Sequence, residues 1–171
     1  HLVTEAENAE SASNGAHRLC FVDAVHRTIT GLYSIPIDDA PLLAALQLQS
    51  AIGDYDDAVH GPTYISDTGL ENYVAPALMG RFNDDDELED MVQEEHMQLV
   101  GTSRFEAERR YMQVIKSHVE YYGASFFAVR VMVQATDSED DRSAPKPAII
   151  AVSFEGIFLL SGWNLSVQEF H

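Results

Sequence analysis

Hydrophobic positions along the chain change from a helical to an extended period near residue 123. Between residues 18 and 123, apolar residues recur at steps of three and four, which is the spacing of one face of an α-helix. After residue 123 they alternate with polar residues, as in a half-buried β-strand. The pattern therefore predicts a helical segment followed by a β segment, an α+β chain.

The N-terminal part of the chain is predicted to be irregular and then helical. Residues 1–17 consist largely of Ala, Glu, Ser and Asn with almost no large apolar residue, so we expect a linker or a disordered terminus. A first helix is predicted from Leu19 up to Gly31. Its apolar stripe consists of Leu19, Val22, Val25, Ile29 and Leu32.

Three further long helices are predicted. The run 40–53 contains no charged residue, which is typical of a helix in the middle of a bundle. The segment 84–100 begins with acidic residues that suit a helix N-terminus. A capping box of Ser103 and Glu106 predicts the start of the last helix. Its buried face is expected to hold Ala107, Tyr111, Val114, Ile115 and His118.

The β segment is predicted to form an antiparallel sheet. One strand is expected over residues 127–134, a hairpin over 148–161 that turns at Glu155 and Gly156, and one more strand over 165–170. Three or four strands without a covering helix would leave an unprotected edge. We therefore expect the β segment to be an incomplete sheet.

The net charge of the chain limits the classes of molecule that it is expected to bind. The chain holds 10 Lys and Arg against 28 Asp and Glu, a net charge of −18. This excludes a typical nucleic-acid binder, which needs many cations to neutralise phosphates. Within this acidic chain, residues 101–130 are locally basic.

The basic residues of that segment are the candidate partner-binding site. They are Arg109, Arg110 and Lys116, with Arg104 at the edge. They are expected either to dock an acidic peptide or lipid headgroup, or to form a solvated helix face in which Glu106 pairs with Arg110.

Other chemistry has little support in the sequence. The single cysteine, Cys20, excludes an intramolecular disulfide and fits a reducing cytosol. No signal peptide, transmembrane segment, catalytic motif, phosphate-binding loop or metal-ligand spacing is recognisable, so no catalytic residue, metal or cofactor is expected. His96 and His118 are expected to be hydrogen-bonded core histidines, with His96 capping a carbonyl near Gly101.

Several stretches, taken in order, resemble the FERM domain. They are LLAALQLQSAIGDYD (Leu42 to Asp56), HMQLVGTSRFEA (His96 to Ala107), Tyr111 and YGASF (Tyr122 to Phe126). In the central helical lobe of that family, an A-L-Q helix runs into G-D-Y, and a later histidine leads to a glycine and a Ser/Thr-x-x-Glu-Ala helix start. The hairpin at 148–161 is similar to the opening of the third, PH/PTB-like lobe.

The resemblance implies a fold and a domain organisation. Residues 18–123 would form an acyl-CoA-binding-protein-like helical bundle, the central lobe. Residues 124–171 would be the truncated beginning of an antiparallel PH/PTB-like sheet. Within the family, the chain is most similar to talins and to unconventional myosin or kinesin tails.

The resemblance also implies a function. The chain would be a non-catalytic scaffold module, without a cofactor, that links membrane proteins or cargo to actin or microtubules at the cytoskeleton or cell cortex. Its partners would be cytoskeletal proteins or cytoplasmic tails of membrane proteins, with a weak phosphoinositide contact. The alternatives are a regulatory module of a tyrosine kinase or phosphatase, and an acyl-chain-binding bundle.

Overall fold

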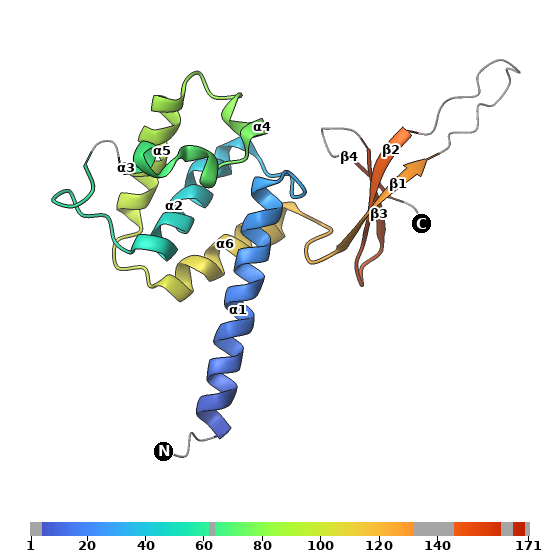
Figure 1. Cartoon of the computed structure of the whole chain (residues 1–171), viewed down its shortest axis with the longest axis horizontal. Coiled ribbons are helices and arrows are strands. Elements are labelled where there is room, and N and C mark those ends of the chain that lie inside the picture. Colours follow the sequence, from blue (N-terminus) through green and yellow to red (C-terminus); the bar gives the residue numbers. More distant parts are fainter. Residues whose placement is uncertain (1–4, 62–63, 132–145, 162–165, 170–171) are drawn as a thin grey trace, which may run out of the picture. The chain divides into compact units, whose positions relative to one another are not determined.

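The computed structural model describes residues 5–61, 64–131, 146–161 and 166–169. It divides into two compact units, His1–Val119 and Glu120–His171. The first unit is helical and the second is a β-sheet (Figure 1). The predicted α+β order is therefore confirmed, and the division between the units lies four residues before the predicted one.

Helix α1 (Glu5–Ile29) begins earlier than the sequence predicted. The expected linker is wrong for residues 5–17, which are helical, because Ala and Glu favour a helix even without an apolar stripe. The predicted apolar stripe is not the buried face of α1, since Leu19 is 71% exposed. The residues of α1 that are buried are Phe21, Ala24 and Thr28.

Helix α2 (Ala40–Ile52) is the central element of the helical unit, as predicted. A short 3-10 helix, η1 (Ile37–Asp39), leads into it, and Pro41 lies in its first turn. Asp39 stands at the N-cap, but its side chain makes no capping hydrogen bond. Helices α5 (Asp85–Gln98) and α6 (Arg104–His118) both pack against α2, which explains why α2 carries no charge (Figure 1).

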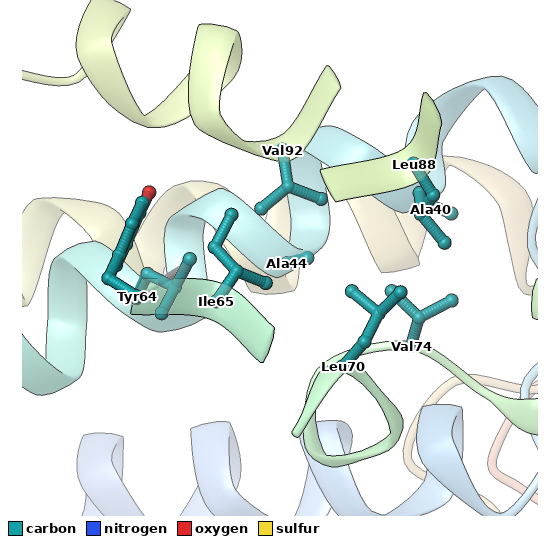
Figure 2. Close-up of a cluster of buried hydrophobic side chains, with 9 residues drawn as sticks. Ala40, Ala44, Tyr64, Ile65, Leu70, Val74, Leu88 and Val92 are labelled. Atoms are coloured by element: carbon teal, nitrogen blue, oxygen red, sulfur yellow. The ribbon is translucent and has the colours of Figure 1, made fainter. Parts of the chain in front are cut away.

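One buried cluster joins α2 to α5 through the segment between them. This segment contains α3 (Tyr64–Thr68), η2 (Leu70–Asn72) and α4 (Pro76–Met79). Figure 2 shows side chains of α2, α3, η2 and α5 pointing toward one another. The cluster consists of Ala40, Ala44, Leu48, Tyr64, Ile65, Leu70, Val74, Leu88 and Val92.

The start of α6 agrees with the predicted capping box, and α5 begins with a side-chain cap as well. The Asp84 carboxylate accepts a hydrogen bond from the Glu87 amide at 2.7 Å. The Ser103 hydroxyl accepts one from the Glu106 amide at 3.3 Å. Each bond satisfies an amide that the first helical turn leaves without a backbone partner, so the chain specifies both starts locally.

The β unit is a four-stranded antiparallel sheet in the order β1-β2-β3-β4. Its strands are β1 (Ser125–Val131), β2 (Lys146–Val152), β3 (Ile157–Ser161) and β4 (Ser166–Glu169). The predicted strands and hairpin are confirmed, except that residues 132–134, 165 and 170 lie outside the described residues. Tyr121, Ala151, Phe158 and Leu160 form part of its buried core.

None of the helices that the structure describes combines the length and the apolar character needed to span a bilayer.

Candidate protein-interaction site

Helix α6 carries the four basic residues of the predicted site, and the structure divides them between two sides of the helix. With 3.6 residues per turn, Arg109, Arg110 and Lys116 lie away from the buried stripe of α6, and all three are exposed. We call these three residues the outer basic face. Arg104 instead lies in the first turn, on the same side as the buried Glu108.

One residue of the outer basic face already has an acidic neighbour. The Nε and Nη2 atoms of Arg109 donate to the two Glu106 carboxylate oxygens at 2.8 and 2.7 Å. This hydrogen bonding lowers the pKa of Glu106 and raises the pKa of Arg109. The predicted Glu106–Arg110 pair is therefore wrong, because Glu106 bonds three residues ahead rather than four. Water screens such an exposed pair, so Arg109 remains accessible to a partner.

A buried carboxylate joins three helices of the helical unit. Glu108 is 3% exposed, and its Oε1 atom accepts hydrogen bonds from Arg18 Nη1 (2.5 Å), Ser50 Oγ (2.9 Å) and Arg104 Nε (2.9 Å). Arg18 Nη1 also donates to Ser50 Oγ at 3.1 Å. We call Glu108, Arg18, Ser50 and Arg104 the Glu108 cluster. It ties α1 and α2 to the first turns of α6.

Glu108 is ionised within this cluster. Burial raises the pKa of its carboxyl, but the hydrogen bonds from Arg104 and Ser50 and the charge of Arg18 outweigh burial, and the pKa lies below its ordinary value. The single negative charge of Glu108 thus lies next to the two permanent positive charges of Arg18 and Arg104.

An aromatic pair lies beside the Glu108 cluster. His17 Nε2 is 3.5 Å from the second Glu108 oxygen, Oε2, and the His17 ring stacks on Phe105 with the ring centroids 4.1 Å apart. The Arg18 guanidinium lies over the Phe21 ring, 5.1 Å from its centroid. These contacts fix the part of α1 that carries Arg18 against the start of α6.

Most of the Glu108 cluster has no local signature in the sequence. Glu108 accepts from residues 58 and 90 positions earlier in the chain, which no local pattern connects. The only local signal is the i,i+4 spacing of Arg104 and Glu108.

The two histidines predicted to lie in the core have different surroundings. His96 is fully buried, as predicted, and its Nε2 atom lies 2.9 Å from the Gly53 carbonyl oxygen while its Nδ1 atom lies 3.1 Å from the Tyr64 hydroxyl. The carbonyl it caps is therefore Gly53, not one near Gly101. The prediction is wrong for His118, which is exposed and lies 2.8 Å from an Asp39 carboxylate oxygen.

The G-D-Y motif ties the end of α2 to the corner between α5 and α6. The Asp54 carboxylate accepts hydrogen bonds from the Gln49 side chain at 2.7 Å and from the Gly101 amide at 2.9 Å. Both bonds lower the pKa of Asp54, the Gln49 bond most strongly. Tyr55 accepts a bond from Gln93 at 3.1 Å. The motif thus has a structural role that needs no ligand.

Chemically, the described side chains offer recognition through charge and hydrogen bonding. Among the described residues, no group of three or more His, Cys, Asp or Glu side chains is placed to hold a metal ion. Cys20 is an exposed free thiol on α1. The accessible cations of α6 and of the Glu108 cluster are the features suited to an acidic ligand.

Comparisons with known proteins agree with the resemblance. The family model of the FERM central domain matches residues 8–127. A talin of Oscarella pearsei is 32% identical over 110 residues, which cover 64% of this chain and 4% of the talin. A mouse protein, tyrosine-protein phosphatase non-receptor type 4, is 31% identical over 110 residues, covering 64% of this chain and 11% of the phosphatase. The chain thus spans a small part of these relatives.

Solved structures share the fold. The structure of the human myosin 7b C-terminal MyTH4-FERM domain in complex with the harmonin-a PDZ3 domain matches with a TM-score of 0.68 and 14% identity. The match covers 87% of this chain and 28% of the myosin chain. At this identity the likeness supports the fold alone.

Proposed function

Because this chain belongs to the FERM central-domain family, we propose that it is a non-catalytic scaffold module of a cytoskeleton-associated protein. It would link cytoplasmic tails of membrane proteins, or cargo, to actin or microtubules at the cell cortex. The observation that carries the proposal is the family match over residues 8–127, which covers the helices of the bundle apart from the first three residues of α1.

The exposed cations give this module a binding site. We propose that Arg104, Arg109, Arg110 and Lys116 contact an acidic region of a protein partner. The support is electrostatic: they form a local basic region in a chain of net charge −18. Such a region attracts an acidic partner while the rest of the surface repels it, which favours one orientation of approach. A phosphoinositide headgroup is a weaker second ligand, because the surrounding acidic surface opposes a flat anionic membrane.

The experiment is a charge reversal in the full-length parent protein. The triple variant Arg109→Glu, Arg110→Glu and Lys116→Glu is expressed in cells, and its enrichment at the cortex is measured by fluorescence imaging. We expect a loss of cortical enrichment. The matched control is Arg81→Glu, which reverses an exposed arginine that lies before α5 rather than on α6. Unchanged enrichment of the triple variant would overturn the binding site, and absence of cortical enrichment in the unmodified parent would overturn the scaffold role.

A regulatory module of a tyrosine phosphatase is the second candidate. It is favoured by the 31% identity to the mouse phosphatase, a protein of which this chain covers 11%. Sequencing the parent gene on both sides of this segment tests it. A phosphatase domain in the same reading frame supports the regulatory role, and a myosin motor or a talin-like rod supports the scaffold role.

A further inference from the structure

Two arginines from different helices meet at one oxygen atom. Arg18 Nη1 of α1 and Arg104 Nε of α6 both lie within 3 Å of Glu108 Oε1, so these two nitrogens are less than 6 Å apart. Like charges at this distance repel each other, and Glu108 supplies only one negative charge between them. The pair therefore keeps a net positive charge that a second carboxylate would neutralise.

Both guanidinium groups can reach a ligand from solvent. The side chain of Arg18 is 40% exposed and that of Arg104 is 60% exposed. A guanidinium has five N–H donors. Among the described residues, Arg104 uses only its Nε, and Arg18 only its Nη1. The remaining N–H groups on the two arginines match the fork geometry that binds a carboxylate through both oxygens.

An exposed aromatic side chain borders this arginine pair. Phe105 follows Arg104 and is 50% exposed, with its ring held by stacking on His17. A ligand that places a carboxylate on the arginines thus finds an exposed aromatic ring nearby.

We propose that Arg18, Arg104 and Phe105 form an anchor for an acidic segment of a protein partner, in which Asp or Glu is followed by a large apolar residue. This inference rests on the proposed scaffold function and identifies the part of the surface that recognises the partner. The carboxylate bridges the two guanidinium groups, and the apolar residue packs on Phe105.

Charge favours a peptide over a membrane as the occupant. Residues 1–119 hold 21 Asp and Glu against 7 Lys and Arg. A flat anionic membrane would bring many charges within a Debye length of about 8 Å of this acidic surface. A peptide segment exposes only a few carboxylates to it, and one of these can reach the arginine pair directly.

The test uses the full chain and a synthetic peptide, Ser-Asp-Glu-Glu-Phe-Leu-Glu-Asp-Ser, with affinity measured by fluorescence anisotropy at 100 mM NaCl. Its counterpart replaces each Asp by Asn and each Glu by Gln. We expect the acidic peptide to bind at least 10-fold more tightly than the counterpart. The double variant Arg104→Gln with Phe105→Ser is expected to weaken binding at least 10-fold. Phe105→Ser alone replaces no residue of the Glu108 cluster and is expected to weaken peptide binding at least 3-fold.

The control pairs Arg81→Gln with Val59→Ser, an exposed arginine and an exposed apolar residue elsewhere in the helical unit, and it is expected to bind as the unmodified chain does. Equal binding of both peptides, or no effect of the Phe105 variants, overturns the anchor. If Arg109→Gln with Arg110→Gln abolishes binding while the Arg104 and Phe105 variants do not, the anchor is wrong and the proposed basic site stands. Tighter binding to phosphatidylcholine vesicles with 20% phosphatidylserine than to the peptide overturns it in favour of a lipid.

Discussion

At the scale of single residues, His96 is held as a neutral ring. Its Nε2–H donates to the Gly53 carbonyl, and its Nδ1 accepts from the Tyr64 hydroxyl. Burial lowers the pKa of His96 and outweighs the hydrogen bond to the Gly53 carbonyl, which raises it. With one proton on the ring both nitrogens have a partner, and burial makes a second proton unfavourable in the folded state.

This arrangement predicts that the helical unit loses stability in mild acid. Below about pH 6.5 the histidine of the unfolded chain takes up a proton while the buried one does not, so the free energy of unfolding falls as the pH falls. One such group gives a slope of at most about 1.4 kcal/mol per pH unit. Urea unfolding at pH 7.5, 6.5 and 5.5, followed by circular dichroism, measures the slope.

The variant His96→Gln should flatten this slope, whatever its own stability. His26→Gln removes an exposed histidine of α1 and should keep the slope of the unmodified chain. An unchanged slope in the His96 variant would assign the pH dependence to other groups.

Glu108 gives a second prediction at this scale. Glu108→Gln leaves two arginines without their shared negative charge, and we expect a loss of about 2 kcal/mol in the free energy of unfolding. This is below the 3–5 kcal/mol of a fully buried pair because both arginines are partly exposed. Thermal or urea unfolding at pH 7 measures it.

The exposed pair on the same helix is the control. Glu106→Gln should leave the stability unchanged, since water screens Glu106 and Arg109. Because the folded-state pKa of Glu108 is lowered, its contribution is present above about pH 4.5 and is lost as the pH falls through the folded value. A Glu108→Gln variant as stable as the unmodified chain would show that burying the charge cancels its bonds.

At the scale of elements, the sequence predicted a helix best where a single local feature determines it. The uncharged run of α2 had to be buried, and the capping box at Ser103 acts within one turn. The buried face of α1 was not predicted. The spacing of apolar residues placed Leu19 on the stripe, whereas the buried residues include Phe21 and Ala24. Which face of α1 is covered depends on α6, eighty residues away, and a single helix pattern does not contain that information.

The same reasoning explains what could be predicted of the candidate site. The composition of the sequence already shows that the segment containing α6 has a net positive charge, and the exposure of Arg109 follows from helical spacing. The arginine pair was not visible, because Arg18 reaches Glu108 only after α1 and α6 have packed together. Contacts between distant elements depend on tertiary packing, which local patterns do not encode.

Replacing either of two glycines by alanine is expected to change the stability of the chain, in opposite directions. Gly53 ends α2 with φ 84° and ψ −153°, a conformation almost confined to glycine, so Gly53→Ala should cost about 1–3 kcal/mol. Gly15 lies inside α1, and a Cβ there would meet nothing within 4 Å. Gly15→Ala should therefore stabilise the chain by up to about 1 kcal/mol. Urea unfolding of both variants compares them, and equal effects would contradict the assignment of strain to Gly53.

At the scale of the whole molecule, the chain consists of two units with separate cores and a strongly uneven charge. The helical core includes Leu48 and Val92, and the sheet core includes Ala151 and Leu160. Most of the acidic excess lies in the helical unit. Under the proposed function, recognition of an acidic partner would depend on a few cations that stand out from an acidic surface, such as those of α6.

That charge distribution predicts a response to salt. Mutual repulsion of the acidic residues destabilises the compact state, and salt shortens its range from about 20 Å at 20 mM to about 6 Å at 300 mM. We expect the melting temperature of the helical unit to rise by about 3 °C between these NaCl concentrations, measured by circular dichroism at 222 nm. The double variant Asp90→Asn with Glu94→Gln removes an exposed like-charge pair at i,i+4 on α5, so its melting temperature should respond less. A melting temperature that falls with salt would mean that attraction within ion pairs such as those of the Glu108 cluster outweighs repulsion across the surface.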